Sequence, residues 1–537
     1  MNHDERDYRR DLKIVAALAG LLGAATFYWF FYHHEILLFG DAVAHINIAR
    51  RVFDSRNPGL LQLGTVWLPL PHLLMIPFVI GHHMWTSGWG GSVPSVLGFV
   101  VGTVGIFRLV RGRASRPTAW IATGTFAINP NLLYMQSTAM TESIFLATVV
   151  WSVVYLDEFL RGMYPDERSR AATLKPTQAV ERCGVALAAA ILTRYDGWVL
   201  AAVVGVVILW VLDRVIRQSG AKPYQPILKS YALFVALCAV TPALWLAHNY
   251  AISARPLDFF NGPYSAKAIE QRTTRPGGPA HPGTGDMKVS AIFFLKSGKL
   301  NVAEEHWQPF LFALALTGTA LALLTPGRFG ALLLLWLPLP FYAYSVAFGS
   351  IPIFIPVWWP HSYYNVRYGL ELLPVFAVFI ALNYEWFHDI PVRWLRSVTA
   401  AGLLLICLGS YARVARAAPI CLREARVNST TRIAVEKTIA SILRHTPPNS
   451  VILMQTGEFV GALERAGIPI RRVIWEGAHT EWDKAMADPA GYADYIVAVQ
   501  GDQVWYATSL FPEDLRIAAE FESPDGRHVD IYKSSRR

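Results

Sequence analysis

Long apolar stretches separated by short polar segments occupy the first three quarters of the chain. About 20 consecutive apolar residues are needed to cross the hydrocarbon core of a bilayer as a helix. Twelve stretches approach this length: Ile14–Tyr32, Val66–Trp85, Ser92–Val110, Thr118–Met135, Ser143–Leu160, Arg182–Thr193, Trp198–Leu212, Tyr231–Asn249, Trp307–Leu324, Phe329–Phe348, Tyr368–Phe387 and Val398–Val414. The pattern predicts a mainly α-helical, polytopic membrane domain over residues 1–417.

Basic side chains between these stretches decide the topology, because cytoplasmic loops carry an excess of Lys and Arg. The clusters are Arg108–Arg116, Arg161–Arg182, Arg214–Lys229, Arg328 and Arg393–Arg396. All of them are cytoplasmic if the short stretch Arg182–Thr193 crosses and the proline-interrupted stretch Val66–Trp85 does not. We therefore expect eleven transmembrane helices, with Val66–Trp85 as a re-entrant or surface segment.

This topology places the N-terminus in the cytoplasm and several polar segments on the outer side. The predicted outer loops are 33–65, 251–305 and 350–365, and the C-terminal region 418–537 lies on the same side. From about Ser450 the pattern changes to short alternating segments, including YIVAV and a final hairpin with Asp525-Gly526 at its turn. This predicts a small soluble α/β domain whose role is acceptor recognition, packing or structure alone.

Composition agrees with a membrane protein, since 53% of the residues are hydrophobic and only 16% are charged. The formal net charge of +9 is explained by cytoplasmic loops and by contact with anionic lipid headgroups. We find no basic stripe interleaved with aromatic residues, so a nucleic acid partner is not expected. The four cysteines show neither a disulfide framework nor a zinc-binding spacing.

The first outer loop contains the polar stretch FGDAVAHINIARRVFD over residues 39–54. Gly40-Asp41 is typical of a helix start, with Asp41 as the N-cap. Helical spacing puts Asp41 and His45 on one face, close to the membrane surface. Asp41 and His45 are therefore candidate site residues, and the alternatives are a helix cap that does no chemistry for Asp41 and a polar interface residue for His45.

An apolar span, an outer loop with an acid near its start, and then TVWLPLPHLL together resemble polytopic glycosyltransferases of the GT-C fold. The likeness is to the bacterial protein O-mannosyltransferase and lipid A aminoarabinose transferase types. It implies that Asp41 is the general base that activates the acceptor hydroxyl. Many relatives carry a second acid next to the first, where this chain has Ala42; no cofactor or metal ligand is assigned, although a divalent metal ion stays open.

Two further motifs agree with this resemblance. Met140-Thr141-Glu142 opens a span, and we expect Glu142 to contact substrate or to support Asp41, or else to complement the helix dipole. The break TRYDGW contains Tyr195 and Asp196, which are candidates for substrate binding because ionisable residues at membrane depth are costly unless paired. A purely structural turn with an Arg194–Asp196 pair is the alternative.

The later outer loops supply cations and hydroxyl groups for a phosphate. Tyr264 and Lys267 lie in the loop 251–305, where 265–272 is expected to form a surface helix presenting Lys267, although solvated loop charge is equally compatible. Asn365-Val366-Arg367-Tyr368 opens a span and resembles a motif of the same enzymes. Its planar guanidinium suits a pair of phosphate oxygens, so we assign Arg367 to the donor phosphate with Tyr368 beside it, against the alternative of an arginine at the interface.

The resemblance covers about 14–414 and implies transfer of a sugar from a polyprenyl-phosphate donor to a protein, lipid or glycan acceptor. The reaction would take place at the outer face of the inner (plasma) membrane, in contact with membrane lipids. A transporter or flippase for a lipid-linked saccharide is one alternative, and it would be expected to show internal repeats, which we do not find. A noncatalytic GT-C scaffold is the other.

Overall fold

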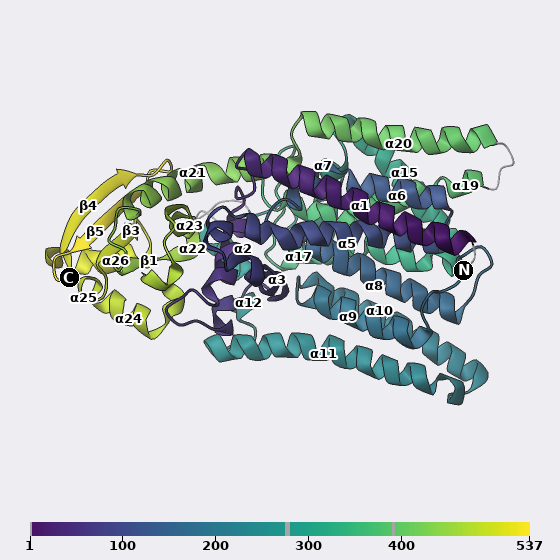
Figure 1. Cartoon of the computed structure of the whole chain (residues 1–537), viewed down its shortest axis with the longest axis horizontal. Coiled ribbons are helices and arrows are strands. Elements are labelled where there is room, and N and C mark those ends of the chain that lie inside the picture. The colour runs from purple at the N-terminus through teal and green to yellow at the C-terminus, as the bar shows by residue number, and fades with distance from the viewer. Residues whose placement is uncertain (1–2, 274–279, 389–392) are drawn as a thin grey trace.

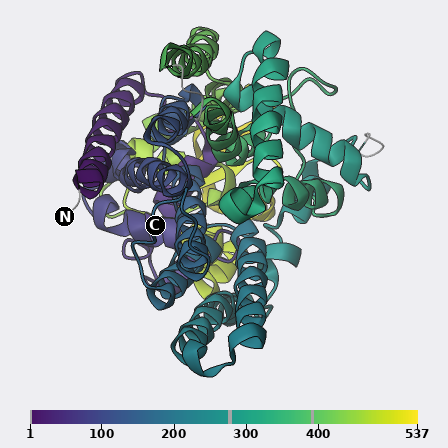
Figure 2. The same cartoon turned by 90° about the vertical axis from the view of Figure 1, so that its right-hand side faces the viewer.

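The computed structural model describes residues 3–273, 280–388 and 393–537. A bundle of long helices forms most of the molecule, and a small α/β domain lies at one end of it (Figure 1). Seen from the opposite end, the helices of the bundle lie in front of the strands (Figure 2). The longest elements of the bundle are α1 (His3–Tyr32), α5 (Trp89–Arg113), α8 (Glu142–Met163), α9 (Pro176–Ile191), α10 (Asp196–Ser219), α11 (Gln225–Ser253), α14 (Met287–Val302), α15 (Gln308–Leu324), α17 (Pro338–Phe348) and α20 (Arg393–Arg416).

The chain is a multi-pass membrane protein. Within the described residues, eight helical stretches are long and apolar enough to cross a bilayer: Glu5–Tyr32, Trp89–Arg113, Glu142–Met163, Asp196–Ser219, Lys222–Ser253, Glu305–Leu324, Pro326–Phe348 and Trp394–Leu443. Other predicted spans consist of shorter pieces, such as α6 (Arg116–Ala127) with α7 (Pro130–Met135), and η5 (Val366–Leu372) with α18 (Leu373–Leu382) and α19 (Glu385–His388). The number of eleven spans therefore stays a prediction.

The segment Val66–Trp85 does not form a continuous crossing helix. It contains α3 (Leu70–Val79) and α4 (His82–Thr86), and ten residues of α-helix are only about 15 Å long, about half the thickness of the hydrocarbon core. Helix α1 leads to the end of the bundle that carries the α/β domain, α2 (Gly40–Arg51) and α3 stay at that end, and α5 leads back (Figure 1).

Basic side chains gather at the other end of the bundle and are held by acids. Arg113 and Arg161 both bind Asp157, with Nε–Oδ distances of 2.5 and 2.8 Å. Arg116 binds Asp11 at the start of α1 with two hydrogen bonds. The Arg113–Asp157 pair connects α5 to α8, and the Arg116–Asp11 pair connects α6 to α1. The predicted cytoplasmic clusters of this region therefore share one end of the bundle, opposite the α/β domain.

Helix α14 lies inside the segment that the sequence analysis assigned to an outer loop, 251–305. Residues 274–279 of that segment lie outside the described part. Phe293, Phe294 and Leu300 of α14 are buried. Gly369 of η5 approaches the backbone of Ser297 so closely that a Cβ on Gly369 would lie 2.4 Å from the Ser297 carbonyl carbon. The sequence pattern predicts no helix here, because Lys288, Lys296 and Lys299 interrupt the apolar residues of α14. The outer position of the segment stays a prediction. The shorter α13 (Ala266–Thr273) agrees with the predicted surface helix.

The C-terminal domain is a five-stranded mixed sheet with strand order β2-β1-β3-β5-β4. The strands are β1 (Ile452–Met454), β2 (Val473–Ile474), β3 (Tyr495–Val499), β4 (Leu515–Glu522) and β5 (His528–Ser534). β1, β2 and β3 are parallel, and β4 and β5 form the predicted antiparallel hairpin, with Gly526 in the left-handed region at φ 84°. The TGEF segment after β1 forms the short helix α22 (Thr456–Phe459).

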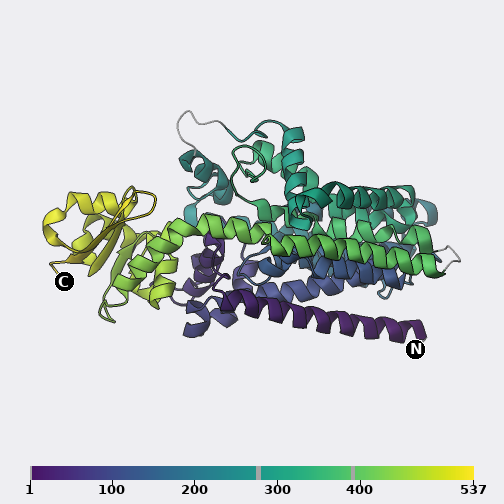
Figure 3. The ribbon, with the colours of Figure 1, turned by 90° about the horizontal axis from the view of Figure 1, so that it is seen from above.

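Helix α21 (Ile420–Leu443) continues the path of α20 and connects the bundle to this domain (Figure 3). The domain also rests on α2 and the residues after it. Asn47 donates a hydrogen bond to the carboxylate of Glu464 at 3.4 Å, Arg471 pairs with Asp54 at 3.1 Å, and the Arg51 guanidinium lies 4.4 Å from the centre of the Trp475 ring. Helix α2 therefore lies between the bundle and the C-terminal domain.

The topology can be tested with single cysteines at exposed positions, His83 between α3 and α5, Ser509 in the C-terminal domain, and Glu167 between α8 and α9. In intact cells, a membrane-impermeant thiol reagent added from outside is expected to label the variants His83→Cys and Ser509→Cys, while Glu167→Cys reacts only after lysis. The unsubstituted chain, whose described cysteines are buried or half-buried, is the control. Labelling of Glu167→Cys from outside would contradict the assignment.

Glu464 of the C-terminal domain, which accepts a hydrogen bond from Asn47 of α2, allows a test of how this domain is held. Burial raises the pKa of its carboxyl to about 8, so the folded protein keeps a proton that the unfolded chain releases above about pH 4.5. Stability is then highest below that pH and falls as the pH rises toward 8. We expect the apparent thermal midpoint of the wild type to fall between pH 5.5 and 8.5, and that of Glu464→Gln to change much less.

The variant Glu513→Gln, which removes an exposed acid of the same domain, is the matched control and should follow the wild type. Identical pH profiles in the wild type and Glu464→Gln would show that the buried carboxyl is not the source of the pH dependence.

Candidate active site

Arg367 lies at the centre of a buried cluster of charges. Its three side-chain nitrogens each face a carboxylate from a different helix: Nη2 lies 2.6 Å from Asp41 Oδ2 of α2, Nε lies 3.2 Å from Glu142 Oε1 of α8, and Nη1 lies 3.5 Å from Glu424 Oε1 of α21. The Arg367 backbone N–H also donates to Glu424 Oε2 at 3.2 Å. Three segments far apart in the sequence therefore meet at one guanidinium.

Asp41 is the most open of these acids. Its side chain is 37% exposed, whereas those of Arg367, Glu142 and Glu424 are 9%, 2% and 1% exposed. Oδ2 accepts from Arg367, and Oδ1 has no hydrogen-bond partner within the described residues. One carboxylate oxygen is thus held in place and the other is available to a ligand.

The expectation that Asp41 is the N-cap of its helix was wrong. Helix α2 begins at Gly40 with Phe39 as its N-cap, and no side chain caps it. Asp41 lies in the first helical turn and turns toward Arg367 instead. Glu142 is the first residue of α8, as predicted.

A second arginine extends the cluster. Arg194, in the break between α9 and α10, donates to the Tyr342 hydroxyl at 2.6 Å and lies 3.3 Å from Glu371 Oε1 and 3.6 Å from Asp196 Oδ2. The Tyr342 hydroxyl donates in turn to Glu371 at 2.7 Å. The predicted Arg194–Asp196 pair is present, and Arg194 Nη1 also lies 3.8 Å from Glu142 Oε1.

The ring of Tyr368 lies between the two arginines. Its centre is 5.0 Å from the guanidinium carbon of Arg367 and 4.7 Å from that of Arg194. Such cation–π contacts are stronger where the groups are desolvated, and Arg367 is buried while Tyr368 and Arg194 are half-buried. The stack holds the two guanidinium groups at a fixed separation, and the Tyr368 hydroxyl has no hydrogen-bond partner in the part of the chain that the structure describes.

Three members of the cluster were not predicted: Tyr342, Glu371 and Glu424. Glu371 had a signal, because an acid inside an apolar stretch is costly unless it is paired. Glu424 had none, since it lies in a charged amphipathic segment that the sequence analysis assigned to the soluble region 418–537. Its burial depends on contacts with residues far away in the chain.

His45 is directed away from the acids toward α3. Its Nδ1 lies 2.8 Å from His72 Nε2, and its ring packs edge-on against Trp67. Burial lowers the pKa of His45 to about 4, so the imidazole is neutral at physiological pH. The structure therefore places His45 beside the cluster as a neutral group in an imidazole pair.

Three predicted substrate residues are not in direct contact with the cluster. The Tyr195 hydroxyl donates to the Val66 carbonyl at 2.8 Å and accepts from Trp245, which fixes the helix break. Tyr264 lies beside Gly457 of the C-terminal domain, where a Cβ on Gly457 would be 3.9 Å from its ring. Lys267 is exposed on α13. Their assignment to substrate stays a prediction.

Among the described residues, no group of three or more His, Cys, Asp or Glu side chains is arranged to hold a metal ion. The carboxylates of the cluster instead face the two arginines. The arrangement offers a partly exposed carboxylate, Asp41, beside the buried Arg367, the half-buried Arg194 and the hydroxyl of Tyr368.

Comparisons with known proteins agree with the predicted fold. Residues 88–255, less than half of the chain, match the family model described as dolichyl-phosphate-mannose-protein mannosyltransferase. No curated protein sequence matches. The chain is similar in structure to ArnT from Cupriavidus metallidurans in the apo state (TM-score 0.56, 13% identity, 95% of this chain and 97% of that chain) and bound to undecaprenyl phosphate (0.55, 13%, 96% and 97%). The fold is therefore the GT-C fold that the motifs predicted.

The role of Arg367 can be tested through stability. Arg367→Gln leaves Glu142 and Glu424 buried without their shared cation, and breaking a buried ion pair in this way costs about 3–5 kcal/mol. We expect a clear fall in the thermal midpoint of the protein in detergent. Arg217→Gln, which breaks an exposed pair with Asp213 at the other end of the bundle, should leave the midpoint nearly unchanged. Equal midpoints for both variants would mean that Arg367 does not hold the cluster together.

Proposed function

We propose that this protein is a glycosyltransferase of the inner (plasma) membrane, which transfers a sugar from a polyprenyl-phosphate donor to an acceptor at the outer face. The observation that carries the proposal is the Asp41 carboxylate, with one oxygen held by a buried arginine and the other unoccupied. The fold supports it, since ArnT shares this fold and has been crystallised with undecaprenyl phosphate. The mannosyltransferase family match over 88–255 supports it as well.

Asp41 serves as the general base. As the acceptor hydroxyl attacks the anomeric carbon, its proton passes to Oδ1, the oxygen that does not contact Arg367. The bond between the acceptor oxygen and the anomeric carbon forms while the bond from that carbon to the phosphate oxygen breaks. The electron pair of the broken bond leaves with the polyprenyl phosphate. Arg367 holds the Asp41 carboxylate in position before the reaction, so the carboxylate does not have to be oriented as the transition state forms.

Arg367 was predicted to bind the donor phosphate, and its surroundings favour a different role. Each of its nitrogens faces a carboxylate, so a phosphate would have to displace one of them. We assign Arg367 to positioning Asp41. The hydroxyl of Tyr368, held between the two guanidinium groups, is then the donor that stabilises the developing charge on the leaving phosphate.

The location of the cluster agrees with a donor presented in the outer leaflet. Asp41 lies at the end of the bundle that carries the C-terminal domain, and the acid-bound basic clusters lie at the other end (Figure 1). By the positive-inside rule the basic end is cytoplasmic. The reaction centre and the C-terminal domain then share the outer side.

Replacement of Asp41 tests this mechanism. Asp41→Asn keeps the shape of the side chain and an oxygen for Arg367, but an amide cannot accept the proton of the acceptor. We expect sugar transfer from a labelled polyprenyl-phosphate donor to fall about 10²–10⁴-fold, the usual contribution of a general base. The thermal midpoint and donor binding should stay close to wild type.

His45→Gln is the comparison variant, because it changes a neutral neighbour on the same helix. It should lose much less activity than Asp41→Asn. A larger loss in His45→Gln would assign the base to His45, and complete absence of transfer in the wild type would favour a noncatalytic scaffold.

A further inference from the structure

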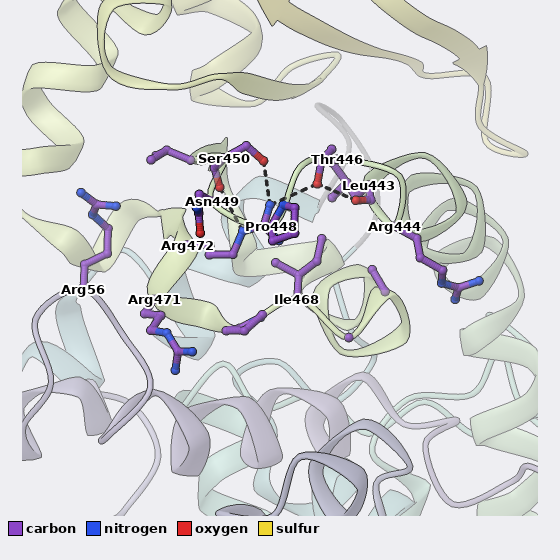
Figure 4. Close-up of a pocket in the computed structure, with 14 residues that line it drawn as sticks. Arg56, Leu443, Arg444, Thr446, Pro448, Asn449, Ser450, Ile468, Arg471 and Arg472 are labelled. Carbon is purple, nitrogen blue, oxygen red and sulfur yellow. Dashed lines mark hydrogen bonds between the residues drawn. The ribbon is translucent and has the colours of Figure 1, made fainter. Parts of the chain in front are cut away.

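A polar pocket apart from the Arg367 cluster lies at the junction between the C-terminal domain and the residues that follow α2. Its volume is about 720 Å³. Four arginines line it, Arg56, Arg444, Arg471 and Arg472, and none of the described lining residues is acidic. Arg56 and Arg471 come from one side and Arg444 from the other, with Ile468 between them (Figure 4).

The charges of this pocket are only partly balanced. Arg56 pairs with Glu481 and Arg471 with Asp54, and neither acid is among the lining residues. Arg472 donates to neutral oxygens only, among them the carbonyls of Ser450 and Pro447 at 3.0 and 2.8 Å.

Arg444 likewise donates to a neutral oxygen, the carbonyl of Arg465 at 2.8 Å. Neither Arg444 nor Arg472 forms an ion pair with a carboxylate in the described part of the chain. Two positive charges of the pocket therefore lack a directly paired carboxylate among the residues that the structure describes.

The size and the remaining lining indicate what kind of anion fits. The pocket volume of about 720 Å³ lies within the range of about 300–1,000 Å³ that is usual for small-ligand pockets. The pocket can therefore hold a ligand larger than an isolated phosphate. Ile468, Leu443 and Pro448 supply apolar surface, while Asn449 and Ser450 supply hydrogen-bonding groups. This combination matches a sugar ring that carries a negatively charged substituent.

We propose that this pocket binds an anionic sugar unit of the acceptor, one that bears a phosphate or a carboxylate. The identification of this ligand as part of the acceptor rests on the proposed glycosyl transfer, whereas the binding itself does not. A guanidinium matches either anion with two parallel N–H donors.

Helix α2 connects the pocket to the catalytic carboxylate. Asp41 lies in its first turn, and Asp54, the partner of Arg471, lies three residues after its end. The twelve residues of α2 span about 18 Å. The charged sugar and the hydroxyl that is glycosylated would then be separate parts of one extended acceptor. The pocket would select acceptors by their charge, at a distance from the Asp41 carboxylate.

Ligand-observed NMR on the purified full-length protein in detergent, without donor, tests the binding. The probes are glucose 6-phosphate and glucuronate, with glucose as the uncharged counterpart and micelles containing phosphatidic acid as a lipid anion without sugar. We expect both charged sugars to bind and glucose to bind at least about tenfold more weakly. Binding of phosphatidic acid without binding of the charged sugars would assign the pocket to the membrane surface and overturn the proposal.

Variants of exposed arginines locate the binding. Arg444→Gln removes a charge without breaking an ion pair and should weaken glucose 6-phosphate binding about three- to tenfold, with a stronger loss in Arg444→Glu. Arg516→Gln, an exposed arginine of β4 outside the pocket, is the matched control and should bind as the wild type does. Thermal midpoints confirm that each variant is folded.

Equal affinity in all variants, or no binding by the wild type, would overturn the proposal. The two proposals fail separately. Normal sugar binding in a protein that shows no transfer would reject the proposed function alone, and transfer by a protein that binds none of the charged sugars would reject the acceptor pocket alone.

Discussion

The buried guanidinium of Arg367 is the interaction on which the functional end of this molecule depends. Three carboxylates from α2, α8 and α21 converge on it, and the two most buried of them would lose their shared cation if it were removed. Desolvated charges are tolerated only when paired with good geometry. The same ion cluster therefore fixes the helices that meet at this point and orients the open oxygen of Asp41.

Helix α2 connects this cluster to α3 and to the C-terminal domain. Its first turn contains Asp41, its middle binds His72 through His45 and Glu464 through Asn47, and its last residue packs on Trp475. Helix α2 is held by contacts with both the bundle and the C-terminal domain. Asp41 and the contacts with the C-terminal domain thus lie on one helix about 18 Å long.

The bilayer explains why the polar groups are concentrated at the two ends of the bundle. Charged groups in the hydrocarbon region are expensive, and non-helical backbone is tolerated there only when buried in protein. One end holds acid-bound arginines such as Arg113 and Arg116, and the other holds the Arg367 cluster and the broken, short elements around it. Irregular backbone at this end, as in η5 and the TRYDGW break, is what allows side chains from separate helices to converge.

The sequence by itself determined the features that depend on neighbouring residues. Apolar length predicted the membrane helices, Glu142 was predicted at a helix start, TRYDGW was predicted as a break, and Asp525-Gly526 predicted the final hairpin. The GT-C fold could be predicted from the order of such motifs, and the comparisons confirm it. Periodicity, turn chemistry and charge bias are local properties, so they can be read along the chain.

Only the tertiary structure decided which of these residues meet. Asp41 and Arg367 are 326 positions apart, and no local pattern indicates that they pair or that Asp41 faces an arginine instead of capping its helix. Glu424 looks like a surface acid of an amphipathic helix and becomes buried only because α21 packs against η5. Burial, pairing and the resulting charge state are consequences of contacts between distant segments, and these contacts exist only in the folded chain.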